Sequence, residues 1–353
     1  MNKQVKYVFL ILTLCLWSVP WAQQTAGTAA VGEVTELFRS EEPLPLRLSY
    51  SQRDIKKITN DSTYIDTDLS YEDSAGEWKT IPVNARVRGN NRLKNCYFPP
   101  IKLKIKKSNT KGTLFEGNKK LKLVMPCLLQ KENNDLVLKE YLGYKLYEPI
   151  SPYHYKTRLV DIEFKEERGK NIKEHKLRGI LIEDIDNIAD RFQANELKRT
   201  VHPLQQDNIG SIRNDLFQYM IGNTDYSSAY QHNQKLLFVE KKTVPIPYDF
   251  DMSGLVDASY AVVSQIGDQE LAITDVTQRL YRGFERTPAE YQQVRQEYLS
   301  HKGEMLAILD KHKADFDDPN EFTRTKDFIV SFFEVLENDG KFGREVLAQA
   351  RDK

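Results

Sequence analysis

The sequence predicts an α+β fold with an N-terminal antiparallel sheet lobe, one helix and a mainly helical C-terminal lobe. Between residues 46 and 124, apolar and polar residues alternate with a period of two, as they do in half-buried strands. Residues 135–150 then place apolar side chains at helical spacing. Helical spacing also dominates the end of the chain. We therefore expect a β-rich lobe over residues 45–186 and a helical lobe over residues 187–353.

The first residues have the pattern of an export signal. Lys3 and Lys6 precede an apolar run, Tyr7 to Trp17, that is too short to span a bilayer comfortably. We predict a signal peptide over residues 1–22, followed by a flexible spacer over residues 23–44 that is small and polar at its start. The mature protein is therefore expected to be periplasmic or extracellular, with no stable membrane span after cleavage.

Composition limits the possible partners. The full chain has 51 basic and 51 acidic residues, and residues 1–22 hold two lysines and no acid, so the mature formal charge is near −2. This balance does not indicate a nucleic-acid partner. The mature chain keeps Cys96 and Cys127. In an oxidising compartment such a pair favours one disulfide, with two buried free thiols as the alternative.

The expected elements follow from the spacing of apolar residues and from turn residues between them. Strands are expected at residues 46–50, 62–73, 79–89, 101–107 and 120–125, and again, after the helix, at 157–167 and 175–184. Further helices are expected at residues 188–200, 211–222, 276–284, 288–312 and 322–353. A sheet with one helix, a short connector and a helical half describes a two-lobed, protein-kinase-like architecture.

One segment, from Gly222 to Asp257, concentrates residues with functional chemistry. It contains an aspartate in GNTD, a histidine and an asparagine in QHN, and two aspartates in YDFD, all set among apolar residues. Carboxylates in apolar surroundings are costly unless a cation compensates for their desolvation. A divalent metal that carries a nucleotide phosphate is the expected cation.

These motifs resemble those of the CotH family of atypical, secreted or surface-associated protein kinases. The resemblance extends over about residues 80–285, through RVRGNNR, IKLKIKK, VLKEYLGYKLY, GILIEDID, YMIGNTD, HN and PYDFD. It implies ATP with Mg²⁺ or Mn²⁺ as cofactors and a protein substrate in the envelope or extracellular space. Phosphoryl transfer then needs a carboxylate that orients the acceptor hydroxyl, and Asp225 is expected to do this. Asn233 and Asp249 would bind the metal, with Asp251 as a second ligand or an outer support.

The spacing departs from that of ordinary protein kinases. There, the catalytic aspartate and the metal-binding asparagine are about five positions apart, whereas Asp225 and Asn233 are eight apart. No glycine follows Asp249 and Phe250 at the third position. Two other interpretations compete: solvated turns in which the aspartates cap a helix and flank a bend, and a calcium loop, whose twelfth position would be Tyr260 instead of glutamate.

The nucleotide side should contain a lysine that contacts phosphates and a glutamate that pairs with it. Glu140, on the helix after the sheet, is the expected glutamate. Lys122, which stands alone between two leucines, is the favoured lysine and Lys102 is the second choice. Arg88, before a glycine turn, is a candidate phosphate contact. Glu183, at a strand end, is placed where backbone groups would contact adenine, with a simple strand-end charge as the alternative.

Three functions agree with these observations. The first is a CotH-like kinase that transfers the ATP γ-phosphoryl group to a hydroxyl of an envelope or extracellular protein. The second is a catalytically inactive nucleotide- or metal-binding relative that acts in envelope assembly. The third is another metal-dependent phosphotransferase or hydrolase, against which the absence of a histidine-rich cluster argues.

Overall fold

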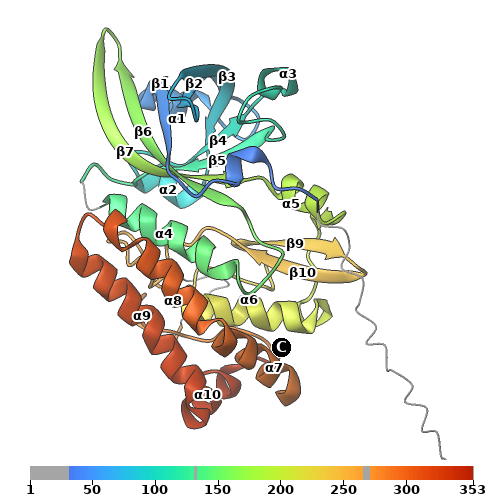
Figure 1. The fold of residues 1–353 in the computed structure, drawn as a ribbon. Coiled ribbons are helices and arrows are strands. Elements are labelled where there is room, and N and C mark those ends of the chain that lie inside the picture. The colour runs from blue at the N-terminus through green and yellow to red at the C-terminus, as the bar shows by residue number, and fades with distance from the viewer. Residues whose placement is uncertain (1–31, 131–132, 265–270, 353) are drawn as a thin grey trace, which may run out of the picture. The chain divides into compact units, whose positions relative to one another are not determined.

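The segments with period-two alternation form a closed barrel. The computed structural model describes residues 32–130, 133–264 and 271–352, and residues 32–353 make one compact unit (Figure 1). The predicted signal peptide lies outside the described residues. The barrel strands, in spatial order, are β1 (Leu44–Tyr50), β2 (Ile65–Glu72), β3 (Trp78–Val87), β4 (Ile101–Lys104), β5 (Lys120–Val124), β7 (Asn171–Glu183) and β6 (Thr157–Arg168).

The barrel closes because β1 pairs in parallel with β6, from Leu44 opposite Val160 to Tyr50 opposite Glu166. All other neighbouring barrel strands are antiparallel. The expected two-lobed kinase-like fold with an antiparallel sheet is therefore wrong: the sheet is mixed and closed, and a separate three-stranded sheet follows it. Alternation identifies strands with one buried face, but it does not specify which strands pair to close the sheet.

The inward faces of the barrel strands form an apolar core. Leu46 of β1, Ile101 and Leu103 of β4, and Leu121 and Leu123 of β5 are each at most 2% exposed. Lysines alternate with these residues on the outer face of the barrel: Lys102 and Lys104 in β4, and Lys120 and Lys122 in β5. Strand pleating thus places a row of lysines on the side of the barrel away from its core.

Helix α4 (Asn133–Tyr147) connects the barrel to the rest of the molecule. It packs against β6 and β7 and against α8 (Lys302–Lys311), as Figure 1 shows. Most of its side chains are buried. A Cβ added at Gly143 would lie 3.0 Å from the Phe250 ring, so glycine permits close contact here. The predicted helix over 135–150 is confirmed, and it holds Glu140 beneath the barrel.

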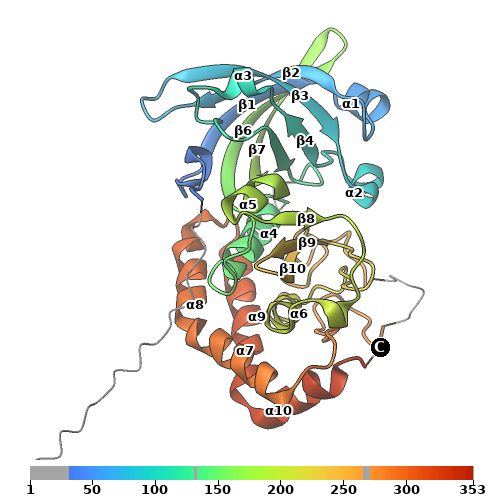
Figure 2. The ribbon, with the colours of Figure 1, turned by 90° about the vertical axis from the view of Figure 1, so that its right-hand side faces the viewer.

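The remaining helices and strands lie between barrel strands in the sequence or follow the barrel. Short helices α1 (Gln52–Ile58), α2 (Asn90–Asn95) and α3 (Lys107–Thr110) lie between barrel strands. After the barrel come α5 (Ile185–Arg191), β8 (Asn195–Leu197), α6 (Asn208–Met220), β9 (Gln234–Val239), β10 (Lys242–Pro247), α7 (Pro288–Ser300), α9 (Pro319–Glu337) and α10 (Asp339–Glu345). Strand β10 packs against α6, as Figure 2 shows. The predicted boundary after residue 186 falls inside α5.

Four predicted helices differ from the structure. The one expected at 288–312 is divided into α7 and α8, and the one expected at 322–353 is divided into α9 and α10, which ends at Glu345. The one expected at 188–200 ends at Arg191, and part of its remainder is β8. Residues 276–284 form no helix. Here Arg279 donates to the Met220 carbonyl at 3.1 Å, and Arg282 donates to the carbonyls of Thr224 and Tyr226. These long-range hydrogen bonds override local helical spacing.

Cys96 and Cys127 form a disulfide next to α2. The backbone N–H groups of Tyr97 and Phe98 also donate to the Cys127 carbonyl, at 2.7 and 3.3 Å, so hydrogen bonds join these segments as well as the disulfide. The disulfide is compatible with an exported protein. Within the described residues, no helix has the length and apolarity needed to cross a bilayer.

Removing the disulfide should destabilise the fold. The bond closes a segment with a sequence separation of 31, and loop entropy then predicts a loss of about 3–4 kcal/mol in the Cys96→Ser/Cys127→Ser double variant. Urea denaturation of both proteins without reductant measures this difference, and addition of reductant should remove it. Coincident unfolding curves without reductant would count against the bond.

Candidate functional site

A tight hairpin brings Asn233 and Asp249 together. Strands β9 and β10 pair from Val239 opposite Lys242 to Gln234 opposite Pro247. The two connecting residues, Glu240 and Lys241, both have positive φ, as a two-residue hairpin turn requires. Asn233 directly precedes β9, and its carbonyl accepts a 3.1 Å hydrogen bond from the N–H of Tyr248, which directly precedes Asp249.

Both residues have strained backbones. Asn233 has φ 53° and Asp249 has φ 66°, in the left-handed region where asparagine and aspartate are the best-tolerated side chains after glycine. The Tyr144 hydroxyl accepts the Asp249 N–H at 3.0 Å. The Phe250 ring packs against Tyr144 and Phe217 at centroid distances of 4.5 and 5.2 Å. Buried aromatic packing thus holds this conformation, and such strain concentrates at functional sites.

Asp225 lies beside Asn233 despite the long spacing between them. The backbones of Ser227 and His232 exchange two hydrogen bonds of 3.1 and 3.0 Å, which folds the intervening residues into a loop. The Asn233 side-chain amide donates to the Asp225 carbonyl at 2.6 Å and to its carboxylate at 3.0 Å. Because its Nδ2 atom is used in this way, the Oδ1 atom of Asn233 is the one that can face a cation.

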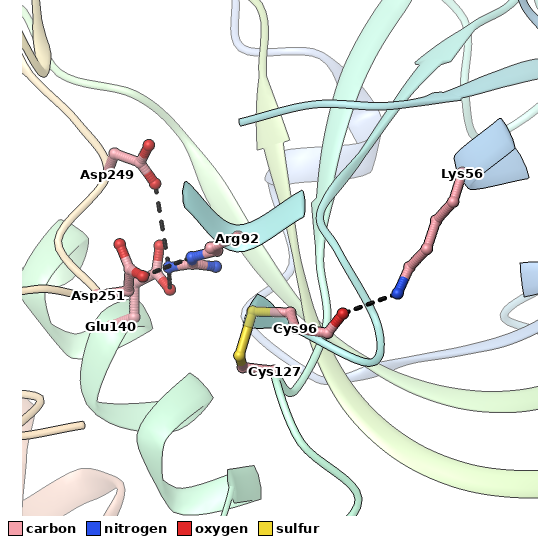
Figure 3. Close-up of a disulfide and its surroundings, with 7 residues drawn as sticks. All are labelled: Lys56, Arg92, Cys96, Cys127, Glu140, Asp249 and Asp251. Atoms are coloured by element: carbon pink, nitrogen blue, oxygen red, sulfur yellow. Dashed lines mark hydrogen bonds and ion pairs between the residues drawn. A yellow bond between two sulfur atoms is a disulfide. The ribbon is translucent and has the colours of Figure 1, made fainter. Parts of the chain in front are cut away.

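A buried arginine that the sequence analysis did not identify connects the site. Arg92 of α2 is 7% exposed. Its guanidinium lies 2.5 Å from Asp251 and 2.7 Å from Glu140, and 3.9 Å from Asp249 (Figure 3). Glu140 was expected to pair with a lysine, and Arg92 takes that place. Two carboxylates bordered by apolar residues were a signal that a buried cation was required.

The site has more negative than positive charge around Arg92. Burial raises the pKa of Glu140 to about 7 although Arg92 opposes the shift. Burial also raises the pKa of Asp251 against the effect of Arg92. For Asp249 burial is outweighed by Arg88 and Arg92, and its pKa is lowered. Oε1 of Glu140 is buried and has no hydrogen-bond partner. An added cation would therefore be favoured, with ionised Asp249 as its first ligand.

These residues face a cleft of about 620 Å³, within the usual range for small-molecule sites. Residues of the barrel side and of the loops after α6 and β10 line it. They are Arg88, Gly89, Arg92, Pro100, Asp225, His232, Asn233, Asp249, Asp251, Met252, Val262, Val263 and Ser264. The cleft thus gathers five of the predicted site residues, and Glu140 lies behind Arg92.

Lys102, Glu183 and Lys122 are not among the residues that line the cleft. Lys102 is 3.7 Å from Asp184. The Glu183 carboxylate receives hydrogen bonds of 3.0 and 2.8 Å from Arg191, which indicates a structural ion pair. Lys122 lies between the rings of Tyr155 and Tyr248, 4.5 and 4.6 Å from their centroids. The two rings shield its ammonium group from solvent.

The shielded position of Lys122 predicts a pH-dependent stability. Burial, with a smaller contribution from Arg88, lowers the pKa of Lys122 to about 7. The unfolded chain keeps this proton up to about pH 10. Burying the charged lysine therefore lowers the free energy of unfolding by its full amount below pH 7, and this cost disappears as the pH rises toward 10. Lys122→Met should therefore stabilise the protein by on the order of 1–2 kcal/mol at pH 6 and less at pH 9. Urea denaturation at both pH values tests this.

An exposed lysine provides the control for that experiment. Lys119→Met, at the end of the preceding turn, should change stability by less than about 0.5 kcal/mol at either pH. If Lys122→Met raised the free energy of unfolding equally at both pH values, the result would contradict a lowered pKa of Lys122. It would reflect apolar packing alone.

The donor set fits a hard divalent cation. Asp249 supplies an ionised carboxylate and Asn233 an amide oxygen, and Mg²⁺ commonly takes one or two carboxylates and keeps several waters. Asp251 is engaged by Arg92, so its place is that of an outer support. Within residues 32–130, 133–264 and 271–352, no three His, Cys, Asp or Glu side chains are grouped as a metal site.

Comparisons of the chain with protein-family models, curated proteins and solved structures found no significant match. The defining features of the cleft are Asp249 in a strained conformation, Asn233 hydrogen-bonded to Asp225, and the Asp225 carboxylate, which accepts a hydrogen bond from a hydroxyl.

Proposed function

We propose that this protein is an exported, CotH-like phosphotransferase that moves the γ-phosphoryl group of ATP to a hydroxyl of a protein in the periplasm or extracellular space. The observation that supports it most is the convergence of Asp225, Asn233 and Asp249 in one cleft. These are the residues that phosphoryl transfer requires, a carboxylate for the acceptor and oxygen ligands for a metal.

Each residue would have a separate role. Asp249 and Asn233 would hold Mg²⁺ or Mn²⁺, which neutralises phosphate charge when it is bound. Arg88, whose guanidinium lies 4.0 Å from Asp249 at the cleft wall, would contact phosphate oxygens. Arg92 would neutralise the negative charge of Asp251 and Glu140, so that Asp249 stays oriented toward the cleft. Asp225 would orient the acceptor hydroxyl and take its proton.

A transfer assay tests this function. The mature protein is incubated with ATP labelled at the γ-phosphate, with Mg²⁺ or with EDTA, and with a serine-rich acceptor protein. We expect metal-dependent labelling that Asp249→Asn removes and that Asp190→Asn, a change at an exposed helix position, leaves unchanged. Binding of Mg²⁺–ATP without any transfer would instead favour an inactive nucleotide-binding protein.

A further inference from the structure

A serine of this chain occupies the place of an acceptor hydroxyl. The Ser264 hydroxyl donates to Oδ1 of Asp225 at 3.3 Å. Ser264 is 6% exposed and lines the cleft together with Val262 and Val263. The carboxylate that would orient an acceptor hydroxyl is thus already in contact with a hydroxyl from the same chain.

The segment that carries Ser264 lies along the cleft. Its backbone turns at Ala258, whose carbonyl accepts the N–H of Ala261 at 2.7 Å. Burial raises the pKa of the Tyr260 phenol, and the neighbouring Asp251 carboxylate raises it further. Tyr260 thus lies at the Arg92 end of the cleft, and the segment continues from there to Ser264 beside Asp225.

We infer that Ser264 is an intramolecular phosphoryl acceptor, an inference that depends on the proposed function. In this step a bond forms between Oγ of Ser264 and the γ-phosphorus of ATP. The bond from that phosphorus to the β,γ-bridging oxygen breaks, and ADP leaves with the electron pair. The hydroxyl proton passes to Asp225 and then to solvent.

Neighbouring hydroxyl groups are less suitable acceptors. Ser259 is exposed and does not line the cleft. The Tyr260 phenol lies near Asp251, whose charge is already engaged by Arg92. The Asp225 carboxylate, by contrast, has neither arginine nor lysine as an ion-pair partner among the described residues, and its ion-pair contact is His232 at 3.5 Å. Its Oδ1 atom therefore accepts the hydrogen bond of the Ser264 hydroxyl without a competing arginine or lysine ion pair.

Labelling and peptide mapping test the inference. Purified protein is incubated with Mg²⁺ and γ-labelled ATP, digested with trypsin, and the peptide of residues 243–279 is sequenced by mass spectrometry. We expect one phosphate per chain on Ser264. The first-order rate constant for labelling should not depend on protein concentration. Ser264→Ala should lower labelling by about 10²-fold or more. Ser264→Thr should restore it as phosphothreonine, and Ser259→Ala should label like the wild type.

The outcomes separate this inference from the proposed function. Label on other residues, or equal labelling of Ser264→Ala, overturns the inference while transfer itself stands. A labelling rate per chain that rises in proportion to protein concentration overturns the intramolecular step. No label on the chain, with full transfer to an added acceptor protein, also overturns it, whereas no transfer to any acceptor overturns both.

Discussion

Arg92→Met should lower the free energy of unfolding by about 3–5 kcal/mol, because it leaves two buried carboxylates without their cation. Arg92 contacts both Glu140 and Asp251 within 2.7 Å, and all three side chains are at most 7% exposed. The loss should be larger at pH 8 than at pH 5. Without Arg92 the pKa values of both acids rise further, so the folded state binds protons that the unfolded state has released. Urea denaturation at the two pH values measures this.

Arg39→Met is a matched control for Arg92→Met. Arg39 also pairs with two carboxylates, those of Glu33 and Glu36 at 2.8 and 2.9 Å, but it is 51% exposed. Exposed pairs contribute about 0–1 kcal/mol, so this variant should unfold nearly like the wild type at both pH values. Equal and small losses in the two variants would show that Arg92 does not compensate the acidic site.

Asp225→Asn should lower phosphoryl transfer by about 10²–10⁴-fold while changing the affinity for Mg²⁺–ATP by no more than about threefold. The amide cannot take the proton of the acceptor hydroxyl, but it can keep the hydrogen bond to Asn233. Initial rates of transfer and a direct titration with Mg²⁺–ATP measure the two quantities separately. The expected signature is a fall in kcat with little change in KM.

A change in binding would contradict that role of Asp225. Equal losses of binding and transfer would place Asp225 among the metal or phosphate ligands, and unchanged transfer would remove it from the site. The Asp190→Asn variant controls for the general effect of removing one negative charge. It should retain both binding and transfer.

Local patterns predicted much of the secondary structure. Period-two alternation located the barrel strands, and helical spacing located α4 and α6, since both signals depend on one buried face per element. The closure between β1 and β6 could not be predicted in this way. It pairs residues that are more than a hundred positions apart, such as Leu44 and Val160, and alternation contains no information about the partner strand.

The residues of the site that are close in sequence could be grouped in advance, and those that are distant in sequence could not. Asp225, Asn233 and Asp249 lie within one short stretch of sequence, so turn residues and apolar neighbours were enough to group them. Arg92 and Glu140 come from distant parts of the chain, and only the folded chain brings them within ion-pair distance. Two other candidates, Lys102 and Glu183, pair with Asp184 and Arg191 instead. Charge alone does not distinguish such structural pairs from ligand contacts.

The most direct test of a metal–nucleotide site at Asp249 is the thermal stability of the mature protein with ATP and Mg²⁺, and with Mn²⁺ as a second metal. Ligand at about 100 times its Kd stabilises the folded state by about 2.7 kcal/mol. We expect a metal-dependent rise in Tm for the wild type and for Asp190→Asn, and no rise for Asp249→Asn. No rise in the wild type at millimolar ligand, or the same rise in Asp249→Asn, would contradict a nucleotide site in this cleft.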